Sequence, residues 1–99
     1  MPAALPPLPV VQAFVEQRLA TMGRYGRHPD GGMERLVYTP PWRAAVRELE
    51  SWLHADGLQL RRDAVGNTYG VLPGRDQSPS IVTGSHLDTT RRGGLYDGT

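Results

Sequence analysis

The spacing of apolar residues predicts a first amphipathic helix from Val10 to Met22. One helical face carries the apolar residues and the other carries glutamine, glutamate and arginine. The apolar residues are Val10, Val11, Phe14, Val15, Leu19 and Met22. Gly23 follows directly and is a typical helix stop. The polar stretch from Gly23 to Tyr38 then predicts a loop, in which Asp30-Gly31-Gly32 requires a turn.

A second helix is predicted between Thr39 and Gly57. Thr39 suits the N-cap, Pro40 and Pro41 suit the first turn, and Gly57 suits the position just beyond the last turn. Apolar residues recur on one face at three- and four-residue spacing: Trp42, Ala45, Val46, Leu49, Trp52 and Leu53. Two tryptophans on one stripe could form a recognition surface, but core packing against a sheet is the simpler interpretation.

Strands are predicted in the second half of the chain. Residues Leu58–Arg62 and Thr68–Leu72 alternate around a turn at 63–67 and predict a hairpin. The β-branched run at Ile81–Ser85 predicts a buried strand, which normally belongs to a parallel or mixed sheet covered on both faces. A helix is expected to begin just after Asp97-Gly98. The predicted fold class is therefore α/β: two helices, a hairpin and the first strand of a mixed sheet, incomplete because the βα unit stops within its loop.

Composition narrows the class of protein. Ninety-nine residues allow one small domain at most, and we expect a proline-rich leader at 1–9 and the N-terminal portion of a domain at 10–99. The formal charge of +1 gives no strong field for nucleic acid or a membrane surface, and no apolar run is long enough to cross a bilayer. The N-terminus lacks signal-peptide features, so a cytoplasmic protein is expected. The absence of cysteine restricts any metal site to nitrogen and oxygen ligands.

Candidate chemistry gathers in the last twenty residues, where the predicted strand leads into His86-Leu87-Asp88 and a glycine-rich loop brings in Asp97. On an extended segment His86 and Asp88 point to the same side, because side chains alternate with period two. A metal-bound imidazole usually donates its other N–H to a carboxylate, and Asp88 is placed to accept it. Asp97 could bridge two metal ions at the carboxyl end of the strand. Two such cations would lower the pKa of a bridging water and polarise a substrate carbonyl.

These residues also have simpler interpretations. His-x-Asp alone is most often a surface histidine, and Asp97-Gly98 alone is a turn. The combination is more specific: an apolar strand, Gly-Ser, His-x-Asp-Thr, Gly-Gly and then Tyr-Asp-Gly. Elsewhere, His54 suits the dipole at a helix C-terminus, and His28 is expected to be solvated in its polar loop.

The remaining charged residues are assigned to the surface. Glu34, Glu48 and Glu50 match no motif and are expected on solvated faces. The pairs Arg61-Arg62 and Arg91-Arg92 lack interleaved aromatic residues, so surface charge is favoured over a nucleic-acid site.

The motif GSHLDT…GGLYDG closely resembles the first metal-binding motif of one hydrolase group. This group comprises N-carbamoyl-L-amino-acid hydrolases, allantoate amidohydrolases and β-ureidopropionases, within the di-metal aminoacylase- and aminopeptidase-like superfamily. Upstream, DGGMERL at 30–36 resembles the group's Gly-rich Thr-Arg-Leu-type loop, residues 52–67 its passage ending in D-x-x-GN, and LPG at 72–74 its LPG turn. The resemblance extends from Val10 to Thr99.

The resemblance implies roles for three residues. His86 matches the histidine ligand of one metal, Asp97 the carboxylate that bridges both metals, and Asp88 the catalytic-site aspartate that supports the histidine. The implied cofactors are two divalent ions, Zn²⁺ or Mn²⁺, with Co²⁺ or Ni²⁺ also compatible with nitrogen and oxygen ligands. The group's general-base glutamate, other metal ligands, substrate-binding arginine and dimerisation domain match nothing in these 99 residues.

Three functional hypotheses follow from the sequence. In the first, the chain is the N-terminal portion, truncated just after the first metal motif, of a metal-dependent hydrolase of non-peptide C–N bonds. The complete enzyme, a homodimer by resemblance, would cleave N-carbamoyl amino acids, allantoate or related ureides by metal-activated water, and the chain alone would be inactive. In the second, the chain is a non-catalytic remnant ending at Thr99, with at most weak metal binding. A third, a basic-surface binding module, has only scattered arginines behind it.

Overall fold

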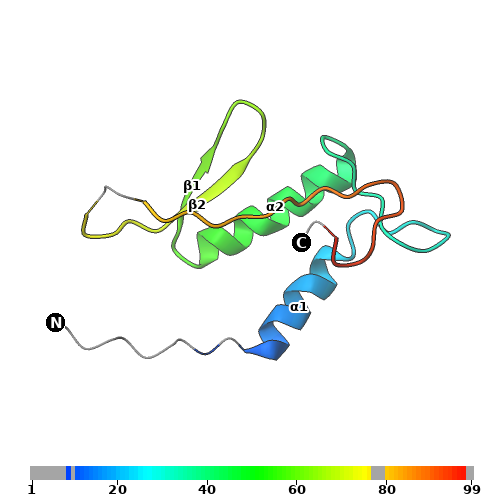
Figure 1. The fold of residues 1–99 in the computed structure, drawn as a ribbon, viewed down its shortest axis with the longest axis horizontal. Coiled ribbons are helices and arrows are strands. Elements are labelled where there is room, and N and C mark those ends of the chain that lie inside the picture. Colours follow the sequence, from blue (N-terminus) through cyan, green and yellow to red (C-terminus); the bar gives the residue numbers. More distant parts are fainter. Residues whose placement is uncertain (1–8, 10, 77–79, 98–99) are drawn as a thin grey trace.

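The structure is a computed structural model and describes residues 9, 11–76 and 80–97. Its elements are α1 (Gln12–Met22), α2 (Pro40–Ala55), β1 (Gln59–Arg62) and β2 (Thr68–Val71). Figure 1 shows α2 in the middle of the molecule, with the hairpin on one side and α1 on the other. Apart from Pro9, the predicted leader lies outside the described residues, as do Val10 and the Gly98 of the predicted turn.

The second helix has the boundaries that its sequence predicts. Pro40 and Pro41 occupy the first two helical positions after Thr39, whose backbone is extended. The Thr39 hydroxyl donates to the Leu36 carbonyl and makes no capping bond to the helix. At the other end Gly57 has φ +79°, and two bonds close the last turn, from Gly57 N to His54 O and from Leu58 N to Leu53 O, both 3.0 Å. This is a Schellman motif, which requires glycine's left-handed freedom.

The first helix ends at Met22 as predicted, but among the described residues of its predicted apolar face only Met22 is buried. Val11 and Phe14 remain 59% and 51% exposed. The contact of this helix with α2 runs through Arg18, whose guanidinium carbon lies 4.6 Å from the Phe14 ring centroid and 4.2 Å from that of Trp52. A cation thus lies between two aromatic faces where the pattern predicted apolar packing.

The predicted hairpin is present and packs on α2. Strands β1 and β2 pair antiparallel, with Gln59 opposite Val71 and Arg62 opposite Thr68. The prediction that Glu50 is solvated is wrong: its side chain is 8% exposed and pairs with Arg62 through N–O distances of 2.5 and 2.7 Å. The pair forms because the hairpin folds back over α2, a contact that no local pattern predicts.

The turn of the hairpin is organised by Asp63. One carboxylate oxygen accepts the backbone N–H groups of Val65 and Asn67 at 3.1 and 2.9 Å. The other accepts the Asn67 amide at 2.7 Å and the Tyr69 hydroxyl at 3.1 Å. The Asp63 carboxylate therefore reinforces a turn that two backbone bonds also close, from Asp63 N to Asn67 O and from Gly66 N to Asp63 O.

The predictions that the two tryptophans pack against a sheet and that His28 is solvated hold only in part. Trp42 is half-buried and packs edge to face on Tyr38, with ring centroids 5.2 Å apart, while Trp52 faces Arg18 rather than the sheet. His28 is not simply solvated: its side chain is 21% exposed and its ring nitrogens lie 3.9 Å from Asp30 and 3.8 Å from Glu34.

The prediction of a buried strand at Ile81–Ser85 is wrong for this structure. The segment forms no strand, and Ile81 and Val82 are 100% and 81% exposed. The trace of residues 80–90 runs alongside α2 (Figure 1), separated from it by a cavity rather than joined to a sheet. A strand needs a neighbour for its backbone N–H and C=O groups, and among the described residues β1 and β2 pair only with each other.

The buried core is small. Among the described residues, the buried apolar side chains are Met22, Met33 and Ala45, and buried polar residues, Arg35, Glu50 and Thr89, are equally numerous. The Cα radius of gyration is 15.9 Å, above the roughly 13 Å of a compact domain of about 100 residues. The larger radius and few buried apolar groups indicate an open arrangement with little hydrophobic stabilisation.

Candidate functional site

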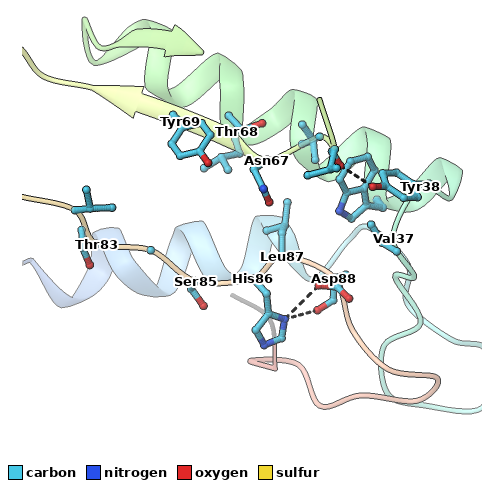
Figure 2. Close-up of a pocket in the computed structure, with 17 residues that line it drawn as sticks. Val37, Tyr38, Asn67, Thr68, Tyr69, Thr83, Ser85, His86, Leu87 and Asp88 are labelled. Carbon is cyan, nitrogen blue, oxygen red and sulfur yellow. Dashed lines mark hydrogen bonds and ion pairs between the residues drawn. The ribbon is translucent and has the colours of Figure 1, made fainter. Parts of the chain in front are cut away.

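The segment after Gly84 places His86 and Asp88 on one side of the chain and Leu87 on the other. Figure 2 shows the His86 ring and the Asp88 carboxylate together, with Leu87 pointing the opposite way, toward α2 and the hairpin. The period-two alternation predicted for an extended segment therefore holds here, although the segment is unpaired.

The His86 ring is held in one tautomer by Asp88. Its Nδ1 lies 2.8 Å from the Asp88 backbone oxygen and 3.4 Å from the carboxylate Oδ1. A carbonyl oxygen can only accept, so Nδ1 carries the proton and donates it. In the neutral ring the other nitrogen, Nε2, is then unprotonated and presents a lone pair, which is the form that binds metals.

The free ring nitrogen faces Asp97. His86 Nε2 and Asp97 Oδ1 are 3.8 Å apart. Two donor atoms that each lie about 2.0–2.2 Å from one Zn²⁺ ion can be separated by at most about 4.4 Å. The pair therefore fits the distance that one shared ion requires, and its nitrogen and carboxylate donors suit a divalent first-row metal.

This pair does not by itself make a complete metal site. Within the part of the chain that the structure describes, no three or more His, Cys, Asp or Glu side chains are gathered so as to hold a metal ion. Asp88 lies on the Nδ1 side of the ring and supports the histidine rather than adding a third donor. The side chains of His86, Asp88 and Asp97 are 59%, 44% and 50% exposed, so all three are open to solvent.

Arg35, to which the sequence assigned no role, lies directly behind this site. It is fully buried, at 0% exposure. Its Nε donates to the Leu87 carbonyl at 2.9 Å, and its Nη1 donates to the carbonyls of Met22 and Tyr25 at 2.7 and 3.0 Å. Burial lowers the pKa of the guanidinium, while the nearby charge of Asp88 acts in the opposite direction.

The residues around Arg35 connect both halves of the site. The Thr89 backbone N–H donates to the Arg35 carbonyl at 2.8 Å, and the Arg35 N–H donates to the Thr89 hydroxyl at 2.8 Å. Two residues earlier, Met33 and Gly93 exchange two backbone bonds of 2.7 Å. We call Met33–Arg35 the clamp segment, because it holds both the His86-bearing segment and the loop that leads to Asp97.

A cavity of about 430 Å³ opens beside the site (Figure 2). Tyr38, Trp42 and the hairpin turn line one wall, and residues 82–88 line the other. The backbone of the segment that carries His86 and Asp88 is thus one wall of an open space.

The chain is similar in sequence to known amidohydrolases. No family model matches the chain. It is 47% identical over 90 residues to an allantoate amidohydrolase of Bacillus subtilis (strain 168), a match that covers 89% of this chain and 22% of that protein. It is 38% identical over 86 residues to an N-carbamoyl-L-amino-acid amidohydrolase of Paenarthrobacter aurescens, covering 86% of this chain and 21% of that protein.

A solved structure agrees in three dimensions. The crystal structure of a hydantoinase/carbamoylase family amidase from Burkholderia ambifaria superposes with a TM-score of 0.81 at 38% identity, covering 87% of this chain and 22% of that one. The chain is a homologue of the N-terminal part of these amidohydrolases. This confirms the resemblance and the partial α/β fold that the motifs predicted.

The homology covers only the N-terminal part of these amidohydrolases. The chain spans about a fifth of the length of the curated relatives that it matches. Those relatives are named for small-molecule substrates, allantoate and N-carbamoyl-L-amino acids. No helix in the described parts of the chain is long and apolar enough to span a membrane.

Proposed function

We propose that this chain forms the N-terminal part of the catalytic domain of a metal-dependent amidohydrolase that cleaves a non-peptide C–N bond. The observation that carries the proposal is the arrangement of His86, whose Nδ1 is bonded to Asp88 and whose Nε2 faces Asp97 at 3.8 Å. Homology to allantoate and N-carbamoyl-L-amino-acid amidohydrolases over most of the chain supports the choice of reaction class.

Each of the three residues has a defined task in this proposal. His86, through Nε2, and Asp97, through its carboxylate, would be the residues of this chain that hold a divalent metal. Asp88 holds the His86 ring in the tautomer that leaves Nε2 free. A pair of divalent ions, Zn²⁺ or Mn²⁺ with Co²⁺ or Ni²⁺ as alternatives, supplies polarisation of the substrate carbonyl and activation of the attacking water.

The substrates that we propose are allantoate, N-carbamoyl amino acids or related ureides. These molecules share a planar ureido or amide carbonyl, the group whose C–N bond such a site would break. We further propose that the complete protein is cytoplasmic and works as a homodimer, as the resemblance implies. The 99-residue polypeptide alone is expected to be inactive, because its two donors do not complete a metal site.

The proposal is tested on the protein as its source makes it. Intact mass, metal content and ammonium or amino-acid release from allantoate and N-carbamoyl-L-amino acids would be measured. We expect a mass several times that of these residues, stoichiometric divalent metal, and turnover that His86→Ala abolishes. An exposed histidine elsewhere provides the matched control, so His54→Ala should leave turnover unchanged.

The alternative, a non-catalytic remnant, predicts a different result. The protein would then have the mass of the 99 residues alone, bind Zn²⁺ weakly and turn over none of these substrates. The observation that favours the remnant is that no group of three or more possible metal ligands is found among the described residues. A full-length protein with bound metal but no turnover of any ureido or amide substrate would contradict the proposed reaction.

A further inference from the structure

A buried cation beside an exposed candidate site requires an explanation. Arg35 lies at 0% exposure, and every acceptor that the structure gives its guanidinium is a neutral backbone carbonyl. Burying a charge without a salt-bridge partner is costly, and a chain with such a small apolar core has little stability to spare. Its cost is offset in part because the guanidinium supplies donors to three backbone carbonyls, which an apolar side chain would leave unpaired.

The bonds of Arg35 converge on the segment that orients His86. Its side chain fixes the carbonyl of Leu87, and its backbone fixes the amide and hydroxyl of Thr89. Asp88 lies between these two anchors, and it is the Asp88 carbonyl that accepts the His86 Nδ1 proton at 2.8 Å. With residues 87 and 89 both held, the direction of the Asp88 carbonyl is determined.

We propose that Arg35 is a positioning residue that sets the His86 tautomer by fixing the backbone on both sides of Asp88. The planar guanidinium reaches three carbonyls at once, which the single ammonium of a lysine cannot reproduce. The inference rests on the proposed function only where it gives the tautomer a purpose, metal binding. The tautomer itself depends on this chain's own residues. In a metal-binding protein it would keep Nε2 available to the ion.

The test measures the ¹⁵N chemical shifts of the two His86 ring nitrogens by NMR in the 99-residue chain. The ¹⁵N shifts of the neutral ring show which nitrogen carries the proton and so distinguish the two tautomers. We compare Arg35→Met and Arg35→Lys with Arg62→Met, a control that removes an arginine paired with Glu50 on the hairpin, away from the site. Amide exchange at Thr89 reports the backbone anchor independently.

We expect the wild-type ring to be predominantly Nδ1–H. Arg35→Met and Arg35→Lys should both shift it toward Nε2–H, because the Leu87 carbonyl loses its Nε donor. Exchange at the Thr89 amide, whose acceptor is the retained Arg35 backbone carbonyl, should quicken only as far as the clamp segment moves, and Arg62→Met should leave both readouts unchanged. An Arg35→Met protein that keeps the Nδ1–H ring overturns the proposal. Restoration of the wild-type ring by Arg35→Lys also overturns it, because charge rather than fork geometry would then suffice.

Loss of the fold in Arg35→Met would not end the test. Thr89→Val removes the hydroxyl that accepts the Arg35 N–H and donates to the Thr90 carbonyl, and it should shift the tautomer ratio partway in the same direction. An unchanged ratio in Thr89→Val would then count against the proposal. Titration with Zn²⁺ alone of the protein as its source makes it, wild type against His86→Ala, tests the proposed function separately: equal affinities would refute the metal role and leave the tautomer result standing.

Discussion

Two glycines in the loop before α2 share a left-handed backbone but differ in how closely other atoms pack against them. Gly26 and Gly31 both have left-handed φ, +89° and +100°. A Cβ at Gly26 would lie 2.7 Å from the Glu34 carbonyl oxygen and 3.0 Å from the Arg35 Cβ, whereas a Cβ at Gly31 would meet nothing within 4 Å. The left-handed conformation costs a residue with a Cβ about 1–2 kcal/mol, and the clash at Gly26 adds about 1–3 kcal/mol of overpacking.

The two alanine variants should therefore differ in how easily the clamp segment opens. The Glu34 amide donates to the Gly26 carbonyl at 2.6 Å, so hydrogen exchange at Glu34 reports this opening directly. Relative to Gly31→Ala, Gly26→Ala should speed exchange at Glu34 by roughly 5- to 150-fold, the equivalent of about 1–3 kcal/mol. The acceleration cannot exceed the point at which the Glu34 amide has lost all of its protection from exchange.

The same experiment includes its control. Gly31→Ala shares the conformational penalty but not the clash, so it reports the cost of the left-handed φ alone. Exchange at Gly93 should follow the behaviour at Glu34, because the Gly93 amide bonds to Met33 of the clamp segment, to which Glu34 belongs. Equal acceleration in the two variants would refute the role of close packing at Gly26.

Three further outcomes are expected. Hydrogen bonds from the Asn67 side chain, its backbone N–H, Val65 and the Tyr69 hydroxyl hold the pKa of Asp63 below its ordinary value. Their stabilisation is fully present above about pH 4 and is lost as pH falls through the lowered pKa; Asp63→Asn should flatten this acid dependence, measured by amide exchange at Asn67. The purified 99-residue polypeptide should release no ammonium or amino acid from allantoate or N-carbamoyl amino acids; turnover abolished by His86→Ala would contradict this. Its thermal unfolding should be broad and of low amplitude, since few apolar side chains are buried; a sharp cooperative transition by circular dichroism would show this reasoning to be wrong.

Much of the candidate site was predictable because its motif is short. His86, Asp88 and Asp97 lie within twelve positions of one another, and period-two alternation places the first two on the same side. Their proximity in the structure agrees with that expectation. The distance of 3.8 Å between His86 and Asp97 still required the folded loop, since a glycine-rich connection has no single geometry.

The clamp segment was not predictable in the same way. The sequence predicted a polar loop at 23–38, and an arginine in such a loop is normally exposed. Its burial arises from bonds to Leu87 and Thr89, residues 52 and 54 positions away. No periodicity or spacing along the chain encodes such a contact.

The sequence by itself determined the elements whose signals are local: both helices, the Gly57 stop, the hairpin and its turn at Asp63. These depend on hydrogen bonds between residues a few positions apart, so residue type and spacing are enough. Only the tertiary structure decided that Glu50 is paired and buried, that Arg35 lies behind the site, and that Ile81–Ser85 is exposed and unpaired. Each of these depends on which distant segment lies alongside, because burial and strand pairing are properties of neighbours in space.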